Sequence, residues 1–242
     1  MGPKRLLQTL AVGESMNGRA QRWRTRGLLF DLDGTLVDSS AAIARAWSAV
    51  ASRHSFPVED ILPLLPGRRA IDVLKLLELS AIDRKAELVR LEAEQQILGP
   101  LRPIRGADTL LLKCPPERWA VVTAAPASVA RARLRAAGLP LPQVLIAAES
   151  VAQGKPAPDG YLRAAAALDL APGDCVVFED AVIGIDAARS AGCCTIAIGA
   201  QIRGADHHIA DYDELQDFRA DGGEISWTVQ ERAGRTRNRA YS

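Results

Sequence analysis

From Gly27 onward, the chain alternates between short apolar runs and longer segments with a helical pattern. The apolar runs span residues 27–31, 119–123, 144–147, 175–178 and 195–198. Most of them are continuous stretches of hydrophobic residues, which is typical of parallel strands covered on both faces, whereas half-exposed strands alternate apolar and polar positions. We therefore predict a parallel β-sheet built from these five runs.

Helical patterns lie between the predicted strands. Those at 128–137 and 182–191 are each followed by a glycine, a common residue just past a helix C-terminus, and a further helix is predicted at 159–168. Strands that alternate with helices are joined by right-handed crossovers. The predicted fold class is therefore α/β, a doubly wound parallel sheet with a Rossmann-like core. Ligands of such sheets bind beyond the carboxyl ends of the strands.

Residues 39–103 interrupt this alternation. They contain no convincing strand, and prolines and glycines separate their helical patterns. These patterns span residues 41–53, 70–79 and 84–98. We predict a small all-helical cap, residues 39–103, inserted after the first strand of a catalytic core that comprises residues 27–38 and 104–230.

The two ends of the chain carry different patterns. The turn sequence Asp221-Gly222-Gly223 separates strand-like runs at 215–219 and 224–229, which predicts a short C-terminal β-hairpin. Residues 1–26 are basic, and their apolar piece is short, broken and without a signal-peptide cleavage pattern. We expect residues 1–26 to form a disordered basic arm and the arginine-rich residues 231–242 to form a disordered tail.

Composition and charge narrow the possible partners. The 242 residues are 48% hydrophobic and 24% charged, which is ordinary for a globular protein. A net charge of +1 gives no overall field that would favour nucleic acid or a membrane surface. The four cysteines show no C-x-x-C spacing, which fits reduced thiols. We expect a cytoplasmic protein without nucleic-acid or membrane partners, and the sequence leaves monomer and dimer open.

Polar side chains that could act in catalysis or metal binding follow the predicted strands, at the point where each strand ends. In chain order they are Asp31, Asp33, Thr123, Lys155, Glu179 and Asp180. Carboxyl ends of parallel strands share one rim of the sheet, so these side chains should meet. Carboxylates held that close repel one another unless positive charge shares the site. Asp31, Glu179 and Asp180 offer the hard oxygen ligands that suit Mg²⁺, and Lys155 supplies a second positive charge.

These residues and their order resemble the four motifs of the haloacid dehalogenase-like phosphohydrolases. The segments that carry the resemblance are Asp31-Leu32-Asp33-Gly34-Thr35, then Thr123, then Gly154-Lys155-Pro156, then Glu179-Asp180 followed by Gly184 and Ala191-Gly192. The similarity extends from about Leu28 to about Gln230. Val37-Asp38-Ser39 and Tyr161-Leu162 add similarity to the sugar-phosphatase branch, which hydrolyses small sugar and polyol phosphates.

The resemblance implies a role for each matching residue. Asp31 would be the nucleophile that forms an aspartyl-phosphate, and Asp33 the general acid and base. Thr123 and the backbone N–H of Ala124 would hold phosphoryl oxygens. Lys155 would neutralise the nucleophile and the transferring group, an electrostatic effect that dominates phosphoryl transfer.

The resemblance also implies a magnesium site and a substrate-reading cap. Mg²⁺ would be held by Asp31, Asp180, Glu179 and the backbone carbonyl of Asp33. In the cap, Gly67-Arg68-Arg69 lies in a predicted loop before a helix and is a candidate for binding the substrate beyond its phosphate; a basic pair at a surface helix start is the alternative. The expected reaction is hydrolysis of a small phosphorylated sugar or polyol.

Two other functions stay open from the sequence. A β-phosphoglucomutase-like isomerase shares both aspartates, but members usually carry a cap-hinge histidine where this chain has Ile43. A signalling receiver domain also combines acids, threonine and lysine around Mg²⁺. In receivers, however, the acid pair comes first and the lysine last, whereas here Glu179 and Asp180 follow Lys155.

Overall fold

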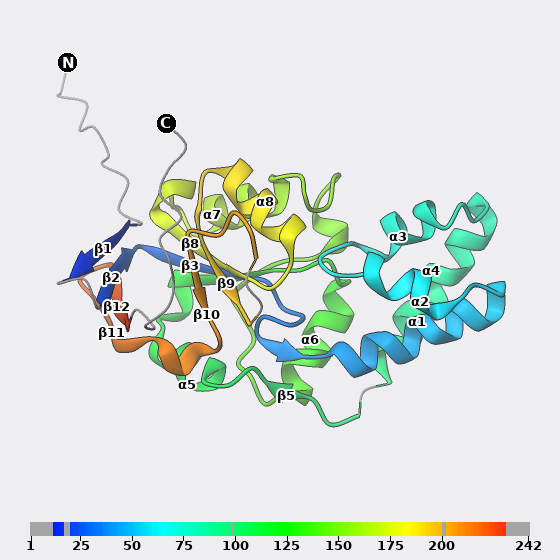
Figure 1. Cartoon of the computed structure of the whole chain (residues 1–242), viewed down its shortest axis with the longest axis horizontal. Coiled ribbons are helices and arrows are strands. Elements are labelled where there is room, and N and C mark those ends of the chain that lie inside the picture. The colour runs from blue at the N-terminus through cyan, green and yellow to red at the C-terminus, as the bar shows by residue number, and fades with distance from the viewer. Residues whose placement is uncertain (1–11, 17–19, 98, 200–201, 231–242) are drawn as a thin grey trace, which may run out of the picture.

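The computed structural model describes residues 12–16, 20–97, 99–199 and 202–230, and its centre is a six-stranded sheet (Figure 1). The strands, in spatial order, are β10 (His207–Ile209), β9 (Cys194–Ile198), β8 (Cys175–Glu179), β3 (Gly27–Phe30), β6 (Trp119–Val122) and β7 (Val144–Ile146). All five pairings within this sheet are parallel, and β3 lies between β8 and β6. The predicted fold class is confirmed.

Helices cover both faces of the six-stranded sheet. One face packs on α5 (Ala107–Lys113) and α6 (Ala127–Ala136), and the other packs on α7 (Asp159–Ala167) and α8 (Val182–Ala191). Successive β3 residues point to opposite sides, so Leu28 and Phe30 join the first hydrophobic core and Leu29 joins the second. This double burial explains why the strands are unbroken hydrophobic runs in the sequence.

The segment after β3 forms a separate helical cap beside the sheet, at the right of Figure 1. The chain enters it through β4 (Val37–Asp38) and returns through β5 (Arg102–Pro103), which pair antiparallel. The cap helices are α1 (Ser40–His54), α2 (Val58–Ile61), α3 (Ala70–Leu76) and α4 (Ala81–Gln96). They enclose their own hydrophobic core, which includes Trp47, Leu74 and Leu91.

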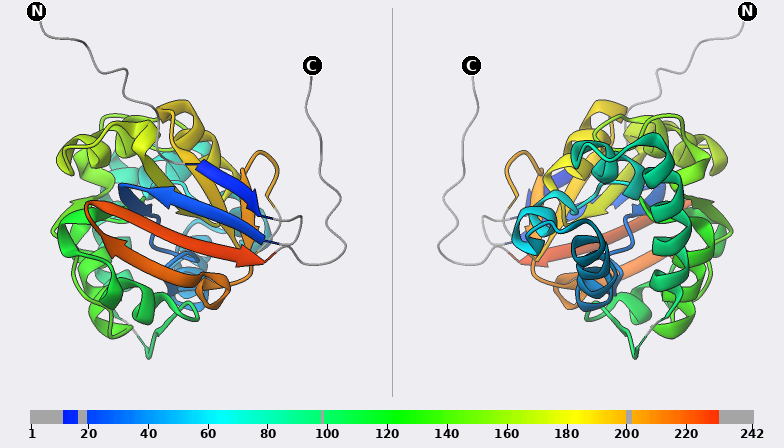
Figure 2. Two further views of the ribbon diagram at one scale, coloured as in Figure 1. Left: turned by 90° about the vertical axis from the view of Figure 1, so that its left-hand side faces the viewer. Right: turned by 90° about the vertical axis from the view of Figure 1, so that its right-hand side faces the viewer.

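A second, four-stranded antiparallel sheet corrects the expectation of a disordered N-terminal arm. Its order is β1 (Val12–Met16), β2 (Ala20–Thr25), β12 (Glu224–Gln230) and β11 (Gln216–Asp221). The C-terminal hairpin β11–β12 is therefore present as predicted, and the N-terminal strands extend it, as the left view of Figure 2 shows. The rest of the expected arm and the expected tail at 231–242 lie outside the described residues.

Two tryptophans explain why the arm folds onto the hairpin. Trp23 of β2 is paired with Trp227 of β12, and their rings stack with centroids 6.2 Å apart. Both side chains are buried in the first hydrophobic core, and the hydroxyl of Thr25 donates to the backbone oxygen of Asp174 at 2.7 Å. Trp23 and Thr25 flank the exposed Arg24, so this short strand alternates inward and outward positions within an otherwise basic segment.

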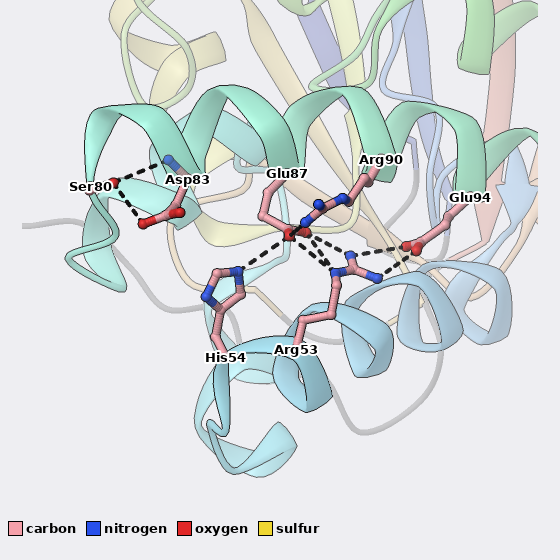
Figure 3. A network of polar contacts seen from close by, with 7 residues as sticks. All are labelled: Arg53, His54, Ser80, Asp83, Glu87, Arg90 and Glu94. Atoms are coloured by element: carbon pink, nitrogen blue, oxygen red, sulfur yellow. Dashed lines mark hydrogen bonds and ion pairs between the residues drawn. The ribbon is translucent and has the colours of Figure 1, made fainter.

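A buried carboxylate joins α1 to α4 inside the cap (Figure 3). The side chain of Glu87 is fully buried and accepts hydrogen bonds from Arg53 at 2.6–3.1 Å and from Arg90 at 2.7 Å, with His54 3.3 Å away. Burial acts to raise the pKa of Glu87, but the hydrogen bonds from Arg53, Arg90 and His54 outweigh it and lower the pKa to about 2. Because the folded state favours the ionised form, this interaction stabilises the cap above the ordinary carboxyl pKa.

We expect Glu87→Gln to destabilise the protein by about 3 kcal/mol at neutral pH, because the change removes the buried carboxylate charge that pairs with Arg53 and Arg90. The difference in the free energy of unfolding between wild type and variant should be largest above about pH 4.5. It should shrink as the pH falls towards about 2, where wild-type Glu87 also becomes neutral. Thermal unfolding of both proteins across this pH range measures it. A difference that stays constant down to pH 2 would contradict the assignment.

Candidate active site

The end of β3 brings Asp31 to the rim of the sheet. The backbone N–H of Asp31 continues the pairing with β8 by donating to the oxygen of Phe178 at 3.0 Å. The chain then turns sharply at Gly34, whose φ of +84° lies in the left-handed region that favours glycine. The pairing with β8 places Asp31 beside the carboxyl end of that strand, where Glu179 and Asp180 lie.

Lys155 lies at the centre of the acidic residues. Its Nζ atom is 2.5 Å from Oδ1 of Asp31 and also donates to Oε1 of Glu179. The side chains of Lys155 and Asp31 are 7% and 6% exposed, so the ion pair is shielded from water. Burial acts to lower the pKa of Lys155, but the Asp31 and Glu179 carboxylates raise that pKa well above its ordinary value. Lys155 therefore carries a full positive charge at this rim.

Glu179 is fixed by four hydrogen bonds. Oε1 accepts from Lys155 and, at 3.0 Å, from the hydroxyl of Tyr161. Oε2 accepts the backbone N–H groups of Asp180 and Ala181, each at 3.0 Å. Gly184 leaves the space this carboxylate occupies, because a Cβ atom there would overlap it. Glu179 therefore holds Lys155 in place, in addition to lying among the possible metal ligands.

The acidic residues fit a magnesium ion. Ligand oxygens of Asp31, Glu179 and Asp180 all lie within 4.8 Å of one another, and such hard oxygen donors are what Mg²⁺ requires. Burial, followed by the charge of Glu179, raises the pKa of Asp180 to about 7, and burial likewise raises that of Asp31. These carboxylates therefore need positive charge beyond Lys155 before all of them ionise at neutral pH. A Cβ atom on Gly34 would overlap the Asp180 carboxylate, so the turn is shaped around it.

Thr123 and Ala124 lie at the end of the neighbouring strand β6. The backbone N–H of Thr123 pairs with the oxygen of Ile146 at 2.9 Å, which extends the sheet to the rim. The Thr123 hydroxyl accepts the N–H of Ala125 at 3.0 Å, so its own hydrogen is left to donate. Thr123 and Lys155 line a small cavity of about 20 Å³ next to the main one.

The main cavity, about 390 Å³, lies between the core and the cap. Its core side includes Asp31, Asp33, Asp180 and Ala124, so the structure brings most of the predicted site residues together in its wall. Its cap side is largely apolar and includes Trp47, Leu62, Leu65, Leu88 and Leu91. A ligand phosphate would lie against the polar rim, with the organic part under the cap.

The three predicted cap residues lie in different places. Gly67 and Arg68 line the main cavity, and Gly67 also packs closely on Ile183 of the core, where a side chain at position 67 would meet Cγ1 of Ile183 at 2.8 Å. Arg69 lies instead in the wall of the small cavity. Its guanidinium donates to Asp72 at 2.7 Å and to the backbone oxygen of Val151 at 3.1 Å, so it joins the cap to the loop before Lys155.

Two residues that hold Asp33 were not predicted from the sequence. Oδ1 of Asp33 accepts from the Ser39 hydroxyl at 2.6 Å, and Oδ2 pairs with Nη1 of Arg133 at 2.5 Å. Arg133 is only 1% exposed, although it lies in helix α6, whose arginine-rich sequence is typical of a solvent-exposed helix. A signal was present, because Arg133 comes four residues after the buried Val129 and so lies on the apolar face of that helix.

Known proteins resemble this chain in sequence and in fold. Residues 25–192 match the family model described as haloacid dehalogenase-like hydrolase. Hexitol phosphatase A of Escherichia coli is 46% identical over 73% of this chain and 84% of its own. Validoxylamine A 7'-phosphate phosphatase of Streptomyces hygroscopicus subsp. limoneus is 35% identical over 70% and 84% of the two chains. Among solved structures, CbbY from Rhodobacter sphaeroides in complex with phosphate superposes with a TM-score of 0.66 and 26% identity, covering 78% of this chain and 96% of that one.

The fold and the site thus define a hydrolase with a doubly wound α/β core and a helical cap over an acidic rim. The chain belongs to the haloacid dehalogenase-like hydrolase family, which confirms the resemblance found in the sequence and the prediction of an enzyme. None of the helices in the described part of the chain is both long and apolar enough to span a bilayer.

We expect Gly34→Ala to abolish magnesium binding, because the added Cβ atom displaces the Asp180 carboxylate. At 100 times its Kd, Mg²⁺ should stabilise the wild-type protein by about 2.7 kcal/mol, whereas the variant should gain nothing. Thermal unfolding with and without Mg²⁺ measures the difference. Gly99→Ala is the control, since the nearest atom to its Cβ would be Nη2 of Arg45 at 3.9 Å. An equal magnesium shift in Gly34→Ala would refute the assigned site.

Proposed function

We propose that this protein is a magnesium-dependent phosphatase that hydrolyses small phosphorylated sugars or polyols through an aspartyl-phosphate at Asp31. The observation that carries the proposal is the buried Asp31 carboxylate, paired with Lys155 at 2.5 Å and located in the wall of a 390 Å³ cavity under the cap. The named activities of its relatives support the same substrate class, since they act on hexitol, fructose 1-phosphate and glycerol 1-phosphate esters.

In the first step, a carboxylate oxygen of Asp31 attacks phosphorus and the bond from phosphorus to the ester oxygen breaks. The proton of Asp33 passes to the leaving oxygen, so the organic part of the substrate departs as a neutral alcohol. Lys155, the Thr123 hydroxyl and the N–H of Ala124 stabilise the negative charge of the phosphoryl oxygens during transfer. The product is a phosphoryl group bonded to Asp31.

In the second step, water attacks the phosphorus of the aspartyl-phosphate. Asp33, now ionised, takes a proton from this water, and the bond between phosphorus and the Asp31 oxygen breaks. Inorganic phosphate is released and both aspartates return to their starting forms. Asp31, Asp180, Glu179 and the backbone carbonyl of Asp33 would hold Mg²⁺. The bound ion would supply the positive charge that lets an anionic phosphate approach the acidic rim.

Cavity size and lining support a small substrate. A volume of about 390 Å³ is near the lower end for small-molecule sites. Arg68 and Glu92 are polar groups of the cap in the cavity wall and are candidates for contacts with hydroxyls of the organic part. Four free cysteines fit a reducing compartment, and we place the reaction in the cytoplasm.

A β-phosphoglucomutase-like isomerase is the second candidate. It would use the same two aspartates but return the phosphoryl group to the sugar instead of giving it to water. The residue that lines the cavity where mutases usually carry a histidine is Ile43, which has no proton to exchange. We therefore favour hydrolysis.

We expect steady release of inorganic phosphate from hexitol, fructose and glycerol phosphates in the presence of Mg²⁺ and none after its removal with a chelator. Asp31→Asn should lower turnover by more than about 10³-fold, because an amide is no nucleophile. The protein should stay folded, because Lys155 keeps its ion pair with Glu179 and the change relieves repulsion among the remaining carboxylates. Asp38→Asn is the matched control, since this nearby carboxylate is exposed and, among the described residues, its side chain accepts a hydrogen bond from Ser40 alone. Phosphate assays and thermal unfolding supply the two measurements.

Two results would overturn the proposal. Retained turnover in Asp31→Asn would exclude Asp31 as the phosphoryl acceptor. Isomerised sugar phosphate without release of inorganic phosphate would instead identify the mutase.

A further inference from the structure

Helix α6 places one charged side chain in the wall of the main cavity. Arg133 is 1% exposed, and its partners are a core residue and a cap residue. Nη1 donates to Oδ2 of Asp33 at 2.5 Å, and Nη2 donates to Oε1 of Gln95 on α4 at 2.9 Å. The guanidinium therefore bridges the proposed acid and base of the core to a helix of the cap.

The geometry of this contact fixes the direction of the Asp33 carboxylate. Ser39 donates to one carboxylate oxygen at 2.6 Å and Arg133 donates to the other. Rotation of the Asp33 carboxylate therefore requires one of these two hydrogen bonds to break. The guanidinium can donate to an oxygen of Asp33 both when the carboxyl group is ionised and when it holds the proton used in the first step, and the contact is shielded from water on the arginine side. Arg133 is thus a rigid support behind a carboxylate that must meet the leaving oxygen.

Burial of the Arg133 side chain is energetically unfavourable for one of its atoms. Its Nε atom is buried and has no hydrogen-bond partner among the described residues. A buried donor without a partner costs free energy, so packing alone does not account for a guanidinium at this position. The two bonds that Arg133 does form both lead into the cavity wall, to Asp33 and to Gln95.

Gln95 makes this support depend on the cap. It is 8% exposed, lies near the end of α4 and lines the same cavity. The seam between α4 and α6 also contains the contact of the Glu92 carboxylate with the Ser128 hydroxyl at 2.5 Å. If the cap moves away from α6, Gln95 leaves Nη2 and Arg133 loses one of its two bonds.

We propose that Arg133 is a positioning residue for proton transfer: held by Gln95 of the cap, it holds the Asp33 carboxylate towards the leaving oxygen of the substrate. The inference rests on the proposed function and deepens it. It predicts that Arg133 matters most for substrates whose leaving group is an alkoxide, because an alkoxide departs only with the proton that Asp33 gives.

Two substrates separate this role from a structural one. A hexitol phosphate needs protonation of its leaving oxygen, whereas p-nitrophenyl phosphate releases a stable phenolate without it. The kcat/KM value reports the steps through departure of the alcohol, so it is free of the later attack by water. A variant that only loosens the fold lowers kcat/KM for both substrates by the same factor.

The experiment compares kcat/KM of Arg133→Met, Arg133→Lys and Gln95→Leu on both substrates with Mg²⁺. We expect Arg133→Met to lower kcat/KM about 100-fold for the hexitol phosphate and far less for p-nitrophenyl phosphate, since a general acid contributes about 10²–10⁴-fold. Gln95→Leu should show a smaller loss with the same selectivity. Arg133→Lys should recover part of the loss, because an ammonium group still reaches one of the two partners.

Arg135→Met is the control, since Arg135 lies on the exposed face of the same helix. In an Asp33→Asn background, Arg133→Met should cause no further loss, because its partner is already gone. Equal losses on both substrates, a loss that persists in the Asp33→Asn background, or no loss at all would each overturn the inference. A wild-type protein inactive on both substrates would refute the proposed function itself, and that result appears before any variant is made.

Discussion

The buried ion pair between Lys155 and Asp31 is the constraint around which the rest of the site is built. Three more carboxylates, those of Asp33, Glu179 and Asp180, raise the pKa of Asp31 beyond what burial does alone, so one lysine does not neutralise the rim. Glycines at positions 34 and 184 leave space where side chains would collide with this cluster. A rim with an excess of negative charge is suited to a divalent cation and, through it, to a phosphate.

The cap completes the site from the opposite side. It contributes an apolar wall, a tight contact of Gly67 with Ile183, and the two bridges that Arg69 and Gln95 make to the core. Neither bridge involves a hydrogen bond to Asp31, Glu179 or Asp180; one leads to the loop before Lys155 and the other leads to Arg133. Placement of the cap and placement of the reactive groups are therefore physically connected.

Much of this could be predicted from the sequence because double burial makes parallel strands continuous hydrophobic runs, and polar residues at their ends then stand out. The helix at 182–191 matches the structure at both ends, and Gly192, at φ +88°, explains where its C-terminal end lies. The N-terminal strands escaped the prediction because Trp23 and Thr25 find their partners about 200 and 150 residues away. The spacing of Arg133 from Val129 places it on the apolar face of α6, but its partners Asp33 and Gln95 are distant in the sequence, so its role could not be predicted from the helix alone.

The central claim is that Asp31 accepts the phosphoryl group. Mass spectrometry of the enzyme, quenched with acid within its first turnover on a sugar phosphate and Mg²⁺, tests this most directly. The account predicts a phosphoryl group on the peptide that contains Asp31, formed and lost at rates compatible with turnover. Turnover with the phosphoryl group on another side chain, or with no covalent phosphate at any time point, would contradict it.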